Sequence, residues 1–374
     1  MSASQVPLAP PPRARRMPYT VSLERRLDEP RWSGLITLVA VRVALVISGL
    51  MIALVGGDPI RSYVHIVGAA FGSPGVISDT LVKATPLILA GLACALAFRM
   101  RLWNIGVEGQ YLMGAWGATA VVMIPLVPAD APAPVMLAAM AVAGFLSGAI
   151  WGSIPGLLKA YLKVNEIIVT LMLNYIALLF IQYWVFGPWS EGGFQMTKQF
   201  PRTAWLPRLS DFADSLPALG GLTVHAGFLI ALLAATVVWL VVRRSRWGFV
   251  IQLVGDSPNA ARYAGVNIKR DIVLVFMASG GLAGLAGMSE VAGAVHRLQD
   301  TSPGYGFTAI IVAYLARFNP LGVIVAAILF AALILAGREI QPSGIPAMVQ
   351  GIVLFCVIAS DVLRRYSVRL QRAA

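Results

Sequence analysis

The sequence predicts an all-α, polytopic membrane protein with about ten transmembrane helices and with both termini in the cytoplasm. The chain is 58% hydrophobic and only 12% charged, whereas a soluble domain carries about 25% charged residues. Its apolar residues fall in runs of about 20, the length that a helix rising 1.5 Å per residue needs to cross a hydrocarbon core of about 30 Å. Basic residues between these runs determine the expected orientation.

Ten apolar segments are expected to be membrane-crossing helices. They cover about residues 35–56, 80–98, 110–127, 134–157, 166–187, 222–242, 271–290, 303–317, 319–337 and 345–363. Together they form a transmembrane domain of residues 35–363. The proline-rich, basic residues 1–34 are expected to be a disordered cytoplasmic arm, and residues 364–374 a basic cytoplasmic tail.

The charge distribution supports an even number of crossings. Lys and Arg outnumber Asp and Glu by 29 to 17, which gives a net charge of +12. We interpret this excess as the positive charge of cytoplasmic loops and not as a nucleic-acid surface. Ten crossings place both termini and the basic loop 243–270 in the cytoplasm, and the loop 188–221 outside.

No catalytic or metal-binding pattern is present in the sequence. Cys94 and Cys356 lie far apart in apolar stretches, and the three histidines lack the spacing of metal ligands. None of the five lysines follows a glycine, so the phosphate-binding loop of ATPases is absent. We therefore expect no enzyme activity, cofactor or metal, and any ATP hydrolysis is expected on another chain.

The stretch "RLWNIGVEGQ" places Asn104, Glu108 and Gln110 between two apolar segments. A charged group at mid-bilayer costs about 2.5–3.5 kcal/mol, so these groups are expected to face protein or water. One interpretation is a tight cytoplasmic turn, with Gly106 and Gly109 in it. The other is a broken helix that lines a solute path.

A second polar interruption, Glu290–Phe307, contains Glu290 and His296 followed by Pro303 and Gly304. Paired interruptions in two halves of a membrane protein are typical of a transport site at a repeat interface. The internal similarity is faint, between "GLACALAF" and "GGLAGLAG", so the repeat is a hypothesis. The glycines of "SGGLAGLAGMSEVAG" indicate a smooth helix face, either for helix packing alone or along a path.

A third polar group opens the segment "VNEIIVTLMLNYIA", where Asn165 and Glu166 sit at the start of the span and Asn174 lies inside it. An amide inside an apolar helix is expected to find a partner across a helix interface. Asn174 therefore serves either as structural contact between helices or as lining of a path.

The longest basic loop contains a short helix whose ends are specified by its sequence. Ser257 suits the N-cap, Pro258 the first helical position and Gly265 the position after the C-cap, so residues 258–264 are expected to be helical. A helix this short is marginal alone. It either packs on a partner protein or is an ordinary connection between two spans.

Four stretches together resemble the bacterial ABC-importer permeases of the branched-chain amino acid and simple-sugar group, most closely the longer permease subunit of nucleoside importers. They are "LWNIGVEGQYLMGAWGA", "VNEIIVTLMLNYIA", "GFVIQLVGDSPNAARYAGVNIKR" and the run from Gly280 to Gly337. The resemblance covers about residues 60–363. Trp103 stands where the family usually has Phe, and "AYLARFNP" departs from its small-residue run; either difference bears on the solute.

The resemblance implies a multi-pass protein of the bacterial inner membrane that imports nucleosides and hydrolyses no ATP itself. The few charges within the predicted spans also suggest a neutral polar solute. Its implied partners are cytoplasmic ABC ATPase subunits, a second permease that is related or identical, an extracytoplasmic solute-binding protein and membrane lipids, without nucleic acid. The residues expected to couple to the ATPase are Gly255, Asp256, Ser257, Asn259, Ala260, Arg262 and Gly265. The solute-path candidates are Asn104, Glu108, Gln110, Asn165, Glu166, Asn174, Glu290 and His296.

Other functions remain open from the sequence. An ion-coupled secondary transporter would use Glu108, Glu290 and His296 as titrating groups. An ABC permease for simple sugars or branched-chain amino acids would share the same motifs. A polytopic membrane enzyme lacks any paired catalytic residues here.

Overall fold

The computed structural model describes residues 19–25, 33–128, 130–299, 304–337 and 344–372. The rest of the expected arm, the last two residues of the tail, and Pro303 lie outside the described residues. In chain order the helices are α1 (Ser33–Leu54), α2 (Pro59–Phe71), α3 (Pro74–Arg99), α4 (Val107–Met123), α5 (Ala133–Leu162), α6 (Glu166–Phe186), α7 (Gly227–Arg244), α8 (Arg246–Asp256), α9 (Pro258–Tyr263), α10 (Ile268–Ser289), α11 (Tyr305–Leu315), α12 (Pro320–Ala336) and α13 (Ile345–Arg365). The short 3-10 helices η1 (Arg202–Ala204), η2 (Leu209–Phe212) and η3 (Pro217–Leu219) follow α6, and the π-helix η4 (Glu290–Val295) follows α10.

Each apolar segment predicted from the sequence is a helix in the structure. Among the described residues, five helices are long and apolar enough to cross a membrane, or six if α1 and α2, bent by 117°, form one span. Shorter apolar helices, including α11 and α12, accompany them. At 1.5 Å per residue α11 rises only about 16 Å, about half of the hydrocarbon thickness, so it is shorter than the segment 303–317 predicted for it.

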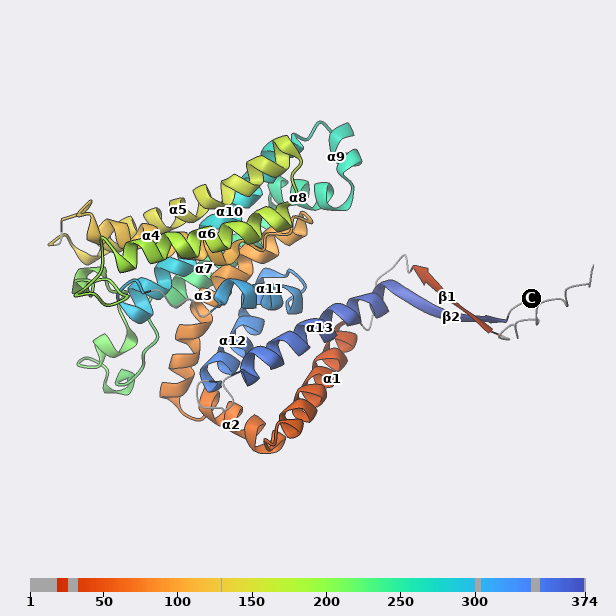
Figure 1. Cartoon of the computed structure of the whole chain (residues 1–374), viewed down its shortest axis with the longest axis horizontal. Coiled ribbons are helices and arrows are strands. Elements are labelled where there is room, and N and C mark those ends of the chain that lie inside the picture. The colour runs from red at the N-terminus through yellow and green to blue at the C-terminus, as the bar shows by residue number, and fades with distance from the viewer. Residues whose placement is uncertain (1–18, 26–32, 129, 300–303, 338–343, 373–374) are drawn as a thin grey trace, which may run out of the picture.

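Helix α10 lies at the centre of the bundle and packs against α3, α4 and α5. Glycines make this packing possible: a Cβ atom added at Gly284 would meet the backbone of Gly144 and Gly148 on α5, and one at Gly114 on α4 would meet Gly284. The predicted smooth face of α10 is confirmed as a helix-packing surface. Helix α12 packs on α3 and α2, and α1 packs along α13 (Figure 1).

Short polar residues followed by proline begin several helices. The Asp58 carboxylate accepts hydrogen bonds from the amides of Ile60 and Arg61, and Pro59 occupies the first turn of α2. Ser257 and Pro258 begin α9 in the same way, and Gly265 follows it with φ of +77°. These local signals position α9 as the sequence predicts.

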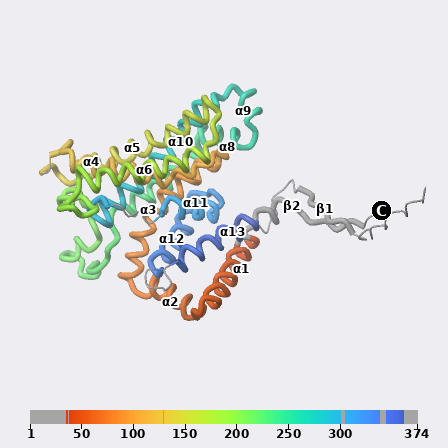
Figure 2. The backbone as a smooth tube through the Cα atoms, viewed as in Figure 1, coloured from red at the N-terminus to blue at the C-terminus, as the bar shows by residue number. Residues whose placement is uncertain are grey.

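The first and last helices of the bundle, α1 and α13, have their terminal ends on the same side of the molecule. The start of α1, the end of α13 and the α8–α9 connection all lie toward the right of Figure 2, whereas residues 187–226 lie at the opposite end. Within the arm that the sequence predicts to be disordered, β1 (Tyr19–Arg25) pairs antiparallel with β2 (Tyr366–Arg372) of the tail.

Candidate functional site

The turn between α3 and α4 is held by a set of amide and hydroxyl side chains, the turn network of Asn104, Gln110, Asn174 and Ser279. Asn104 and Gln110 form a reciprocal pair: Asn104 Nδ2 donates to Gln110 Oε1 at 2.9 Å, and Gln110 Nε2 donates to Asn104 Oδ1 at 3.1 Å. Asn104 also donates to Ser279 Oγ at 2.9 Å, and that hydroxyl donates to the Ala93 carbonyl at 2.8 Å. The network therefore joins the turn to α3 and α10.

Asn174 on α6 completes the turn network from the other side. Its Oδ1 accepts from the Gly109 amide at 2.8 Å, and its Nδ2 donates to the Ile105 carbonyl at 2.9 Å. The predicted partner across a helix interface is thus the backbone at the start of α4. Helix α4 gains a cap that its own Gly106 lacks.

The turn combines features of both interpretations of this stretch. Arg101 at its start is exposed, and its guanidinium lies 3.7 Å from the Asp256 carboxylate on α8. Asn104, in contrast, is fully buried against Ser279 near the middle of α10. The chain makes a tight turn that is recessed into the bundle, and the amides Asn104, Gln110 and Asn174 bind one another and the backbone.

Replacing Asn174 by alanine is expected to destabilise the protein by about 1–3 kcal/mol, because the Gly109 amide and the Ile105 carbonyl lose their partner in a buried site. The change is measured as the free energy of unfolding in detergent. Thr236→Val is a matched control, since the Thr236 hydroxyl donates only within its own exposed helix. Equal stabilities for the two variants would contradict the assigned role.

The two polar interruptions predicted from the sequence meet in a buried carboxylate cluster, which consists of Lys83, Glu108, Glu290, Tyr111 and Tyr305. Glu108 Oε2 on α4 accepts from the Gly306 amide in the first turn of α11 at 2.6 Å. Lys83 Nζ on α3 lies 3.0 Å from Glu290 Oε1 at the start of η4. Tyr111 on α4 and Tyr305 on α11 pack edge to face, with their ring centroids 5.9 Å apart.

The sequence analysis missed Lys83, Tyr111 and Tyr305, and of these Lys83 is the charged member. Its Nζ also lies 5.9 Å from the centre of the Tyr305 ring. A single lysine at the start of an apolar segment is a detectable signal, because a buried cation in a membrane requires a partner. Glu290 Oε1 provides that partner, and a second observation marks the place as strained or functional: the helix changes from α to π there.

His296 belongs to a separate cluster at the end of η4. Its ring stacks on Trp205 with centroids 3.6 Å apart and an interplanar angle of 4°, and its Nε2 faces the Arg208 guanidinium at 2.6 Å. His225 lies buried nearby, where its Nδ1 accepts from the Gly227 amide at 3.1 Å. Burial, with the Arg208 charge, lowers the pKa of both histidines to about 4 from the ordinary 6.5.

Acidification is expected to destabilise this histidine cluster. The folded protein keeps both imidazoles neutral down to about pH 4, whereas in the unfolded chain they take up protons below about pH 6.5. The free energy of unfolding that depends on these two histidines is therefore fully present above pH 6.5 and is lost as the pH falls through about 4. The melting temperature of the double variant His225→Asn, His296→Asn is therefore expected to fall less between pH 6.5 and pH 4 than that of the unaltered protein. His65→Asn, in α2, is the control. Identical pH slopes for the double variant and the unaltered protein would contradict this assignment.

Asn165 and Glu166 lie apart from both clusters, at the start of α6. Asn165 Oδ1 caps the helix by accepting from the Ile167 amide at 2.9 Å. Glu166 Oε2 lies 2.7 Å from Lys159 Nζ at the end of α5. The Lys159–Glu166 ion pair joins the end of α5 to the start of α6.

The α8–α9 connection is anchored at its base and exposed at its tip. Gly255 is buried against the backbone of Arg99 and Met100, so closely that a Cβ atom there would collide with the Arg99 carbonyl. Tyr263 on α9 is 95% exposed. Further exposed residues of this connection are Asp256, Asn259, Ala260, Arg262 and Gly265.

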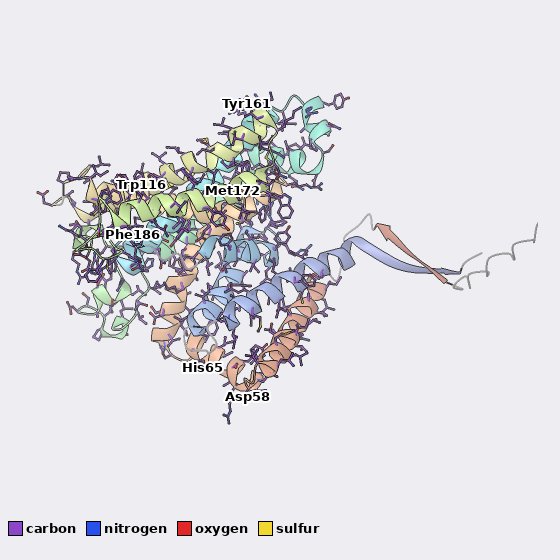
Figure 3. The ribbon with its side chains drawn as sticks, in the orientation of Figure 1. Asp58, His65, Trp116, Tyr161, Met172 and Phe186 are labelled. Atoms are coloured by element: carbon purple, nitrogen blue, oxygen red, sulfur yellow. The ribbon has the colours of Figure 1, made fainter. Side chains whose placement is uncertain are left out.

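Aromatic side chains gather at the opposite end of the bundle. Figure 3 shows Trp116 and Phe186 there, whereas Tyr161 lies near α9. Trp116 packs on Phe180 and Trp189 with ring centroids 5.2 Å and 5.9 Å apart, and Trp184 lies 4.5 Å from Trp189. Within the described residues, the indole N–H groups of Trp116 and Trp184 are buried without a hydrogen-bond partner.

Comparison with known proteins finds a transport-permease family and several ABC transporter permeases. A family model described as "Branched-chain amino acid transport system / permease component" matches residues 76–358. The chain is 36% identical over 370 residues to the glucose ABC transporter permease TsgB13 of Haloferax volcanii, with 94% of each protein covered. It is 34% identical over 343 residues to the guanosine ABC transporter permease NupP of Bacillus subtilis, with 90% of this chain and 94% of that protein covered. It is 31% identical over 336 residues to the nucleoside ABC transporter permease NupB of Lactococcus lactis, with 87% and 89% covered.

Proposed function

Because the chain belongs to the family of branched-chain amino acid transport permeases, we propose that it forms the solute path of an ABC importer for nucleosides. It is a multi-pass permease subunit of the inner membrane and is not itself a catalytic enzyme. The family implies ATPase partners and a second permease. We further assign ATP hydrolysis to the ATPase subunits and solute delivery to an extracytoplasmic binding protein.

The observation that carries the coupling part of the proposal is the α8–α9 connection. Its exposed tip is available to an ATPase, while its base touches the α3–α4 turn through Gly255 and through the Asp256–Arg101 pair. A displacement of α9 is therefore passed to Arg99, Met100 and Arg101, where α3 ends and the turn begins. The end of the bundle that carries residues 243–270 is the cytoplasmic side in this proposal, with the basic arm and tail on the same side.

A nucleoside is favoured as solute over glucose by the aromatic side chains of α4 and α6. Relatives of similar identity are named for guanosine, for nucleosides and for glucose. All of these are neutral polar molecules, in agreement with the few charges inside the bundle. The planar rings and the unpaired indole N–H groups of Trp116 and Trp184 suit a flat base with acceptor atoms.

Replacing Tyr263 by aspartate is expected to reduce ATP-dependent uptake at least about tenfold, because the substitution places a charge in the surface that binds the ATPase. The measurement is uptake of radiolabelled guanosine and of glucose in a deletion strain, together with the amount of ATPase that copurifies. Phe212→Asp, which places the same charge on an aromatic residue that is 53% exposed at the opposite end (Figure 2), is the control.

Three results would overturn parts of the proposal. Uptake by the purified chain alone, driven by an ion gradient, would exclude an ABC mechanism. Glucose uptake without guanosine uptake would exclude the nucleoside. Unchanged ATPase copurification with Tyr263→Asp would remove α9 from the coupling surface.

A further inference from the structure

A cavity of about 650 Å³ lies at the end of the bundle opposite α9. Its floor contains Met288 of α10 and Leu206, both buried, and its walls include Leu137 of α5 and Ile230 of α7. The first turns of α5, from Ala133 to Ala141, line the cavity mostly with small side chains, which leave its volume unfilled. At 1.5 Å per residue this stretch is about 12 Å long, close to the about 15 Å of one leaflet's hydrocarbon.

The walls of this cavity belong to helices whose neighbouring surfaces are apolar and exposed. Helices α5 and α7 both have the length and hydropathy of membrane spans. Beside the cavity, Val135 and Val142 on α5 are 52% and 58% exposed, and Leu229 and Leu233 on α7 are 67% and 65% exposed. Such surfaces are stable only in contact with lipid acyl chains or another membrane chain, so the cavity opens toward one of these two neighbours.

The rim of the cavity carries one cation and one anion. The Arg202 guanidinium lies 4.1 Å from the centre of the Trp205 ring, and Trp205 is fixed in turn by its indole bond to the Phe200 carbonyl at 2.9 Å and by the stacked His296. Stacking uses the face of the guanidinium and leaves its N–H edge suited to a phosphate. Exposed Asp211 also lines the cavity, and its Oδ2 accepts from the Arg208 amide at 2.8 Å.

We propose that this cavity binds a phospholipid with a zwitterionic, primary-ammonium headgroup, that is, a phosphatidylethanolamine. One acyl chain fills the hollow between α5 and α7, Arg202 binds the phosphate, and Asp211 accepts hydrogen bonds from the ammonium group. A phosphatidylglycerol has no ammonium group for Asp211, and a choline headgroup has no N–H to donate. The inference requires only a membrane protein and is independent of the transported solute.

The test uses the full chain, with the partner subunits that copurify, in nanodiscs of phosphatidylethanolamine, phosphatidylcholine and phosphatidylglycerol in equal amounts. Native mass spectrometry counts the lipids that stay bound. The unaltered protein is expected to retain one phosphatidylethanolamine per chain, with at least about tenfold preference over phosphatidylglycerol. Arg202→Ala is expected to lose this lipid, and Asp211→Asn to lose the preference while still binding.

Two matched pairs separate the site from general effects. Ala138→Trp fills the cavity and is expected to expel the lipid, whereas Val135→Trp introduces the same side chain on the neighbouring outer face and is expected to retain it. Arg61→Ala removes an exposed arginine at α2 and is expected to change nothing. Equal lipid retention by Ala138→Trp and Val135→Trp, no headgroup preference, or displacement of the lipid by guanosine or glucose would each overturn the proposal.

Discussion

Replacing Lys83 by methionine is expected to lower the free energy of unfolding by about 3–5 kcal/mol and to abolish uptake. The substitution preserves the length of the side chain but removes the only cation within 4.0 Å of Glu290 among the described ion pairs. A buried carboxylate without its counter-charge is strongly unfavourable in a membrane interior. Unfolding by denaturant in detergent micelles, and uptake in whole cells, measure the two effects.

The double variant Lys83→Met, Glu290→Leu distinguishes a charge effect from a packing effect. Removal of both charges leaves a well-filled apolar site, so most of the lost stability is expected to return. Uptake need not return with it, because the pair fixes η4 against α3. If the double variant is as unstable as the sum of the two single variants, the pair has no stabilising interaction and this account is wrong.

Replacing Gly284 by leucine is expected to destabilise the bundle by about 3 kcal/mol and to reduce the yield of folded protein. The backbones of α4, α5 and α10 approach one another at this residue, so a side chain cannot be placed without separating helices. The yield of monodisperse protein in mild detergent and its unfolding free energy are the measurements.

Gly351→Leu is the matched control for this substitution. Gly351 lies in α13, is exposed, and has no atom within 4 Å of an added Cβ. It is expected to be tolerated, since the added side chain enters open space. Comparable losses for both glycines would show that the effect comes from helix propensity and not from close packing.

The sequence predicted the helices and their local ends well, because both depend on nearby residues. A backbone inside lipid must satisfy its hydrogen bonds within a helix, so the length of an apolar run predicts a span. The ends of α9 follow from Ser257, Pro258 and Gly265, which act within one turn. Helix α2 was missed, since Arg61 and Ser62 interrupt its apolar pattern.

The site could be predicted only in part, because its contacts join distant residues. Lys83 and Glu290 are 207 positions apart, and Glu108 and Gly306 are 198 apart. A sequence shows that buried polar groups need partners but not which partners they find. The three amides Asn104, Gln110 and Asn174 are candidates for a solute path, and in this structure their polar atoms hold a turn. Whether any of the predicted path residues contacts the solute stays a prediction.

The bond between Glu108 and Gly306 constrains how the protein can move. The carboxylate sits in the first turn of α4 and at the same time neutralises the positive end of α11. Pulling the two helices apart would break this buried bond and leave the Gly306 amide without the carboxylate that accepts from it. A gate that keeps this bond must carry the first turns of α4 and α11 together, with its hinges located elsewhere.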